Sequence, residues 1–169
     1  MALHALGSVD PLGLVDARLQ FHYAAQFAAA FAQSVFAPRD DDSHRTLHWD
    51  GNEERFYSES TEDGLRAFVA ADPLAIGLQR DDTDLASLQL MGATLKTAQA
   101  WMEKAIQNAT DDDNFSLSWP EFDLPEHFVL TGRPFQAKSG SLVELAHWYS
   151  GARAQLNAIV SSEADAEPV

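Results

Sequence analysis

The sequence predicts an α+β fold, in which an antiparallel β-meander of four to five strands packs against long N- and C-terminal helices and one middle helix. Three segments, near residues 11–37, 94–109 and 141–159, carry apolar residues at steps of three or four, which is the spacing of a helix with one buried face. Between the first two lie short runs of aliphatic, aromatic and β-branched residues, separated by Asp-Gly, Asp-Pro and Asp-rich turns. This alternation of runs and turns is typical of consecutive strands.

The first helix is predicted to begin at Asp10-Pro11 and to end near Ala37. An Asp can cap the free amides of a first turn, and a Pro is tolerated within that turn. Pro38 and the acidic run after it stop the helix. The residues expected to face the core are Leu12, Val15, Leu19, Tyr23, Phe27, Phe31 and Val35.

The strands are predicted to follow from residue 46 onward. Asp50-Gly51 separates two short alternating runs, which is a strong local signal for a β-hairpin. Three further runs follow, each bounded by turn residues. The predicted strand segments are 46–52, 55–58, 65–69, 74–79 and 85–90.

A middle helix is predicted after Thr94, whose hydroxyl can cap its first turn. Its apolar stripe consists of Leu95, Ala98, Met102, Ala105, Ile106 and Ala109. The stretch from Thr110 to Gly140 contains Trp-Pro, Leu-Pro and Arg-Pro steps, which block a regular helix. We expect an irregular connection there, with one short strand at 128–130.

The last helix is predicted to open at Ser141, because Ser141 and Glu144 have the spacing of a capping box. In that motif the Glu side chain reaches back to the first turn of its own helix. The predicted buried stripe is Leu142, Leu145, Ala146, Tyr149, Ala152, Leu156 and Ile159.

The two long helices are expected to pack on one face of the sheet, antiparallel to each other. If the other face is apolar and uncovered, a homodimer is the simplest arrangement that hides it. The chain, residues 1–169, is predicted to be a single domain. Residues 1–9 and 161–169 are predicted to be frayed.

Composition narrows the range of partners and compartments. The chain has 26 acidic and 11 basic residues, a formal net charge of −15, so nucleic acid and anionic membranes are not expected partners. The acidic runs at 40–42, 81–84 and 111–113 lack the Gly and Glu positions of an EF-hand loop. There is no cysteine and no apolar stretch of membrane-spanning length, so we expect a protein of the cytoplasm.

A divalent metal is the first candidate ligand, because His44 and His48 lie four residues apart and Asp42 is just upstream. Histidines at this spacing can share a metal when they lie on a helix. The segment instead predicts a strand, in which the two side chains would be roughly 13 Å apart. A turn at His44 and a strand position for His48 is therefore the competing interpretation.

A polar line on the first helix is the second candidate. Arg18, His22 and Gln26 follow one another at steps of four, and such a line can face a cavity. His22 could act as a general base. If the two long helices pack together, His147 could approach His22, and His127 from the irregular segment could complete a three-histidine set.

Two functions stay open. No phosphate-binding loop, dinucleotide fingerprint, nucleophile elbow or His-Glu-x-x-His motif is present, which favours a non-enzymatic binding or interaction module that forms a homodimer. The alternative is a metal-dependent or acid/base enzyme that uses a histidine cluster. A small-molecule ligand is compatible with either, because four tryptophans could line an apolar pocket. No cofactor is expected beyond the metal of the alternative.

Overall fold

The computed structural model describes residues 7–121 and 123–162 and confirms the α+β prediction. Its elements are α1 (Pro11–Val35), a 3₁₀ turn η1 (Ser43–Arg45), β1 (His48–Asp50), β2 (Arg55–Tyr57), β3 (Leu65–Ala70), β4 (Ala75–Arg80), β5 (Thr83–Gln89), α2 (Leu95–Thr110), a 3₁₀ turn η2 (Phe128–Thr131) and α3 (Ser139–Ser162). The five strands form one antiparallel sheet in the order β1-β2-β3-β4-β5. The predicted meander is therefore present.

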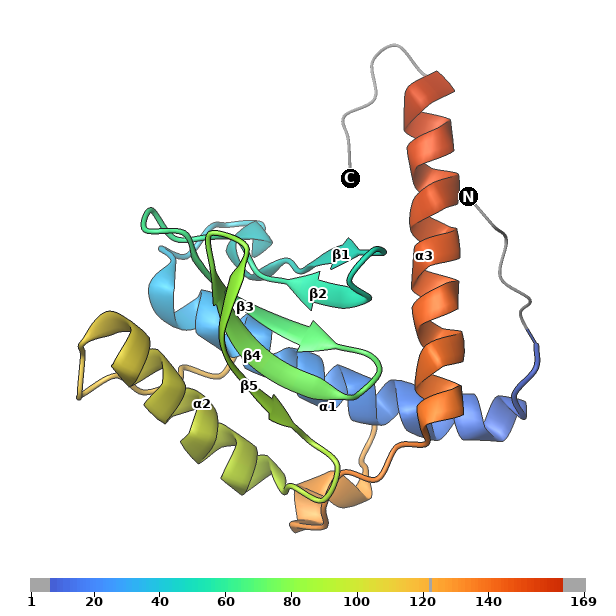
Figure 1. Cartoon of the computed structure of the whole chain (residues 1–169), viewed down its shortest axis with the longest axis horizontal. Coiled ribbons are helices and arrows are strands. Elements are labelled where there is room, and N and C mark those ends of the chain that lie inside the picture. Colours follow the sequence, from blue (N-terminus) through green and yellow to red (C-terminus); the bar gives the residue numbers. More distant parts are fainter. Residues whose placement is uncertain (1–6, 122, 163–169) are drawn as a thin grey trace.

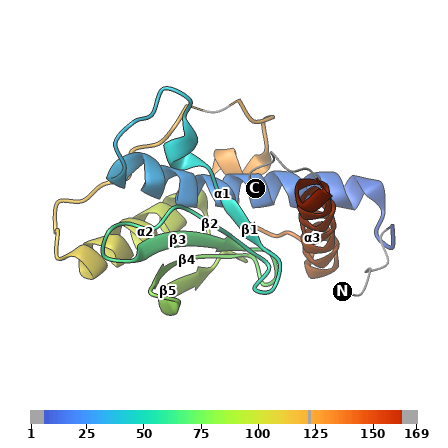
Figure 2. The ribbon, with the colours of Figure 1, turned by 90° about the horizontal axis from the view of Figure 1, so that it is seen from above.

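The first face of the sheet carries the hydrophobic core. In the register of β3 and β4, Val69 pairs with Ile76 and Ala67 with Leu78, and all four side chains are fully buried. Helices α1 and α2 cover this face (Figures 1 and 2), and α2 contacts β4 and β5. The core joins α1, the sheet, α2 and the first turns of α3 in one cluster.

The second face of the sheet carries arginine side chains over its aromatic rings. The Arg55 guanidinium lies 4.2 Å from the centre of the Phe68 ring, and that of Arg66 lies 4.0 Å from the Tyr57 ring. Arg55 also binds Asp84 through two hydrogen bonds of 2.9 and 3.0 Å. Because charged groups cover the aromatic rings, this face does not meet the condition on which a sheet-to-sheet homodimer was predicted.

Helix α3 crosses α1 instead of running antiparallel beside it, so that prediction is wrong. Its first turns lie against α1, next to Gly13, and its middle lies against β1 (Figures 1 and 2). Beyond β1, the upper turns of α3 extend past the sheet. The physical reason is that α1 and α2 already cover the apolar sheet face, which leaves only its β1 edge to α3.

The capping box at Ser141 is also wrong. Helix α3 begins at Ser139, and the Glu144 carboxylate accepts hydrogen bonds from the backbone N–H groups of Gly7 and Val9 and from the hydroxyl of Ser8, at 2.7 to 2.8 Å. Glu144 is buried, with 2% of its surface exposed. It satisfies donors in the segment before α1, not those of its own helix.

The strand predicted at 128–130 is wrong as well, because Phe128–Thr131 form the 3₁₀ turn η2. Val129 is buried there, whereas Leu130 is exposed. Alternating burial in a short apolar run is compatible with either geometry, and no neighbouring strand is available for pairing among the described residues. Residues 7–9 are held by Glu144 and α3 continues to Ser162; residues 1–6 and 163–169 lie outside the described part of the chain.

Candidate functional site

A groove runs between α1, the start of β1 and α3. Two hollows form it, each of about 330 Å³, and Leu47, Phe56 and Tyr149 line both of them. The remaining lining residues of the hollow toward α1 are Phe21, His22, Ala25, Gln26 and Leu124. Those of the hollow toward the upper turns of α3 are Thr46, His48, Trp49, Ala152, Arg153 and Leu156.

The floor of the groove is an aromatic cluster that draws one ring from each of four elements. Phe56 of β2 lies 4.8 Å from Trp49 of β1 and 5.0 Å from Tyr149 of α3, measured between ring centres. Phe21 of α1 lies 5.9 Å from both Phe56 and Tyr149. Aromatic rings at such separations pack favourably, so the cluster fixes α3 against the edge of the sheet.

Two polar side chains of the groove, those of His22 and Gln26, belong to the polar line predicted on α1. His22 and Gln26 both line the hollow toward α1, as expected of residues that face a cavity. Burial lowers the pKa of His22, and the charge of Arg18 lowers it further, so the imidazole is neutral at pH 7. Burial raises the pKa of Tyr149, which the charge of Arg18 partly offsets. Arg18 therefore lies close enough to act on both walls of the groove.

The other predicted histidines are dispersed. His44 is buried and both of its ring nitrogens have partners, the backbone N–H of Arg39 at 3.2 Å and the Gln33 side chain at 3.0 Å. His48 lies in β1 and lines the groove, and Asp42 forms an ion pair with Arg45 at 2.7 Å. His147 is not among the residues that line the groove with His22. Across residues 7–121 and 123–162, no three His, Asp or Glu side chains meet in a way that could hold a metal ion.

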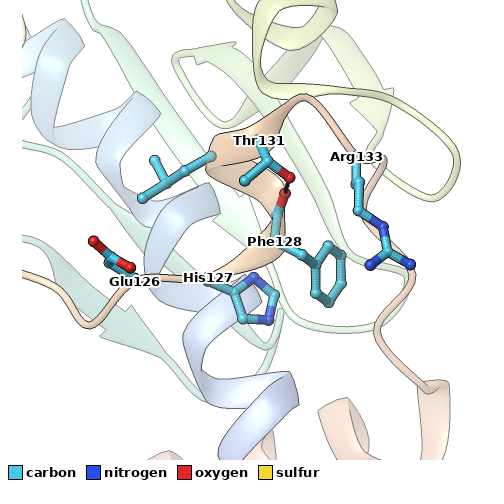
Figure 3. A pocket seen from close by; sticks show the side chains of 6 residues that line it. Glu126, His127, Phe128, Thr131 and Arg133 are labelled. Atoms are coloured by element: carbon cyan, nitrogen blue, oxygen red, sulfur yellow. Dashed lines mark hydrogen bonds between the residues drawn. The ribbon is translucent and has the colours of Figure 1, made fainter.

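A second pocket, of about 550 Å³, lies around η2 and contains His127 (Figure 3). His127 Nε2 lies 3.0 Å from the Asp16 carboxylate. A carboxylate only accepts, so Nε2 carries the proton. Nδ1 is buried without a partner in the described structure. Because one nitrogen is engaged and the other is enclosed, the imidazole holds the η2 segment to α1 and offers no open nitrogen to a substrate.

The outer half of α3 departs most from the sequence prediction. Leu142 and Ala146 are buried as predicted, but Leu156 and Ile159 are 45% and 58% exposed. Trp148 is also half exposed. The apolar stripe of α3 thus continues beyond the residues that α1 and β1 cover.

Sequence reasoning did not identify Phe56 or Arg153 as site residues. A signal for Arg153 was present, because Arg153 follows Tyr149 by one helical turn. What the sequence lacked was the direction of α3, which brings these residues together.

Comparison with known proteins gives no match: no model of a protein family fits the sequence, and no curated protein or solved structure is significantly similar to the chain. Over the part of the chain that the structure describes, no helix combines the length and the apolar character needed to cross a membrane.

Proposed function

We propose that the protein is a non-enzymatic interaction module that forms a homodimer through the outer half of α3. The observation that carries this proposal is the exposure of Trp148 and Ile159 on α3, whose apolar residues in the first turns are buried. An apolar stripe that continues past its intramolecular contacts is a common feature of association surfaces.

The geometry of α3 supports pairing with a second copy. Its 24 residues make a helix of about 36 Å, and its upper turns lie beyond the sheet (Figure 1). A few helical turns without tertiary contacts are only marginally stable in water. Trp148 and Ile159 are eleven residues apart, about three turns, so they lie on one side of the helix. A two-fold axis would place the same stripe of each copy in contact.

The histidine positions argue against the enzymatic alternative. His44 and His127 use their ring nitrogens to hold the fold together, and His22 and His48 line different hollows of the groove. General acid/base chemistry needs a titrating group that reaches its substrate. The lack of cysteine favours a reducing compartment, and we propose the cytoplasm.

Native mass spectrometry and light scattering of tag-free protein test the proposal. We expect a dimer for the natural sequence, and a monomer for Ile159→Glu because the substitution buries a charge in the interface. Asn157→Glu, which adds the same charge on the other side of the helix, should remain dimeric. A monomeric natural protein, or a dimer that Ile159→Glu leaves intact, would contradict the proposal. A stoichiometric metal or organic adduct would instead favour the enzyme.

A further inference from the structure

We infer that the groove between α1, β1 and α3 binds a short polypeptide segment of another protein, in which apolar side chains stand next to carboxylates. This goes beyond the proposed self-association. Tyr149, Arg153 and Leu156 line the groove on the side of α3 turned toward β1. Trp148 and Ile159, which we assign to the dimer, do not line it. The two surfaces can therefore be tested separately.

The shape of the groove fits two apolar side chains of one segment. The two hollows, of about 330 Å³ each, are at the lower end of the range for ligand pockets. Leu47, Phe56 and Tyr149 form the wall that they share. A segment crossing this wall can place one side chain on each side of it, against the aromatic floor. Aromatic anchors in such pockets supply most of the affinity of small interfaces.

The charge of the groove indicates the chemistry of the segment. The chain holds 26 acidic and 11 basic residues, yet among residues 7–121 and 123–162 neither hollow is lined by an Asp or Glu. The ionisable side chains in the lining are instead those of His22, His48, Tyr149 and Arg153. In a chain so rich in acids, an apolar surface without carboxylates is electrostatically set apart from the rest of the molecule.

Arg153 in the groove wall and Arg18 of α1 both lack an acidic partner among the described residues. Within the described residues Arg18 and Arg153 form no ion pair, whereas five other arginines do: Arg39, Arg45, Arg55, Arg66 and Arg80. Arg153 lines the hollow toward the upper turns of α3, whereas Arg18 lines neither hollow. A guanidinium matches a carboxylate with two parallel hydrogen bonds. The hollow toward the upper turns of α3 therefore has a cation in its wall for an acidic residue next to the apolar anchor.

The net charge of −15 does not prevent this recognition. At physiological salt, charges further than about 8 Å away are largely screened. The nearby charges then act most strongly on a bound segment, and Arg153 in the groove wall is one of them. The distant carboxylates slow the approach of an acidic segment more than they weaken the bound complex.

Fluorescence anisotropy with three labelled synthetic peptides tests the inference. The first peptide alternates Leu and Phe with Asp and Glu; the second replaces its acids by Lys; the third keeps the acids and replaces Leu and Phe by Ser. We expect saturable binding of the first peptide only. Arg153→Glu should weaken that binding about tenfold or more. Arg133→Glu is the matched control, because Arg133 also lacks an ion-pair partner among the described residues but lies over Phe128, outside the groove.

The outcomes separate this inference from the proposed function. Binding of the first peptide to the Ile159→Glu variant, at unchanged affinity, would support the groove whether or not the natural protein is a dimer. Equal or tighter binding of the Lys peptide would overturn the inference, and so would equal losses in Arg153→Glu and Arg133→Glu. Absence of saturable binding by the first peptide would overturn it too, provided that circular dichroism shows a folded protein.

Discussion

Trp49 of β1 donates its indole N–H to the hydroxyl of Ser150 in α3, at 3.0 Å. This hydrogen bond joins the edge strand of the sheet to a helix that also packs against it through the Trp49 and Tyr149 rings, 5.3 Å apart between centres. The backbone approaches closely at the same place, since a Cβ atom on Gly51 would lie 3.1 Å from the Ser150 hydroxyl. The width of the groove beside β1 therefore depends on this pair of side chains.

Removing the indole N–H should destabilise the protein. Trp49→Phe keeps much of the aromatic packing but loses the bond to Ser150. We expect the free energy of unfolding to fall by about 1 to 3 kcal/mol, combining the lost hydrogen bond with the smaller ring. Urea unfolding measures this change in the free energy of unfolding. Ser150→Ala is the partner substitution, and the double variant should show less than the sum of the two effects; full additivity would mean that the bond contributes nothing.

Gly77 is required by the ring that lies above it. A Cβ atom at this position would lie 2.3 Å from the Phe68 ring and 2.5 Å from the carbonyl oxygen of Ala86. Gly77→Ala should therefore destabilise the sheet by about 1 to 3 kcal/mol through overpacking. Gly151→Ala is the control, because a Cβ there meets no atom within 4 Å and it should stabilise α3 by up to about 1 kcal/mol. Thermal unfolding of both variants compares them, and equal behaviour would contradict the packing argument.

The hydrogen bonds that Glu144 accepts from residues 7–9 predict that the stability of the protein depends on pH. The Ser8 hydroxyl holds the pKa of Glu144 below its ordinary value; burial opposes this, and the N–H groups of Gly7 and Val9 reinforce it. A lowered pKa in the folded state means that the stabilisation is present above the ordinary value of about 4.3 and is lost as the pH falls through the folded-state value.

Glu144→Gln should flatten this dependence. Melting temperatures of the natural protein and the variant should differ most near neutral pH and converge as the pH falls through the lowered folded-state pKa of Glu144. Glu62 is an exposed glutamate. Glu62→Gln removes the same charge without removing the hydrogen bonds to residues 7–9, and it serves as the control. A constant difference between the natural protein and Glu144→Gln at every pH would show that the carboxylate charge is not what holds Gly7 to Val9.

Self-association should strengthen with salt. Each copy carries a net charge of −15, so repulsion opposes the dimer, and the screening length falls from about 30 Å at 0.01 M salt to about 8 Å at 0.15 M. We expect the dissociation constant to fall about tenfold over this range. Sedimentation velocity at several salt concentrations measures it. A dimer that weakens with salt would indicate ion pairs rather than an apolar interface.

The sequence predicted those features that depend on neighbouring residues. The period of α1 and α2, the cap at Thr94 and the five strands all follow from local patterns, and Thr94 does accept the N–H of Thr97 at 3.1 Å. The failures involve partners that are remote in the chain. Glu144 had the spacing of a local cap but binds residues more than 130 positions away, because the start of α3 crosses the start of α1.

The same reason limited the prediction of the site. The sequence allowed His22 and Gln26 to be placed beside a cavity, because polar residues next to the apolar stripe of a helix lie at the edge of the core. The composition of the opposite wall depends on where α3 runs, and neither the length nor the period of α3 specifies a direction. The exposure of Leu156 likewise could not be inferred, because its position in the stripe is equivalent to that of the buried Leu142.

The meander has a consequence for how the chain matures on the ribosome. Every strand pairs with the one next to it in sequence, so the sheet and α1 can assemble while later residues are still being synthesised. The groove requires α3, which is made after all five strands. A nascent chain that has completed its sheet would still lack one wall of the groove. Such a chain could bind a partner in the groove only after Tyr149 and Arg153 have been synthesised.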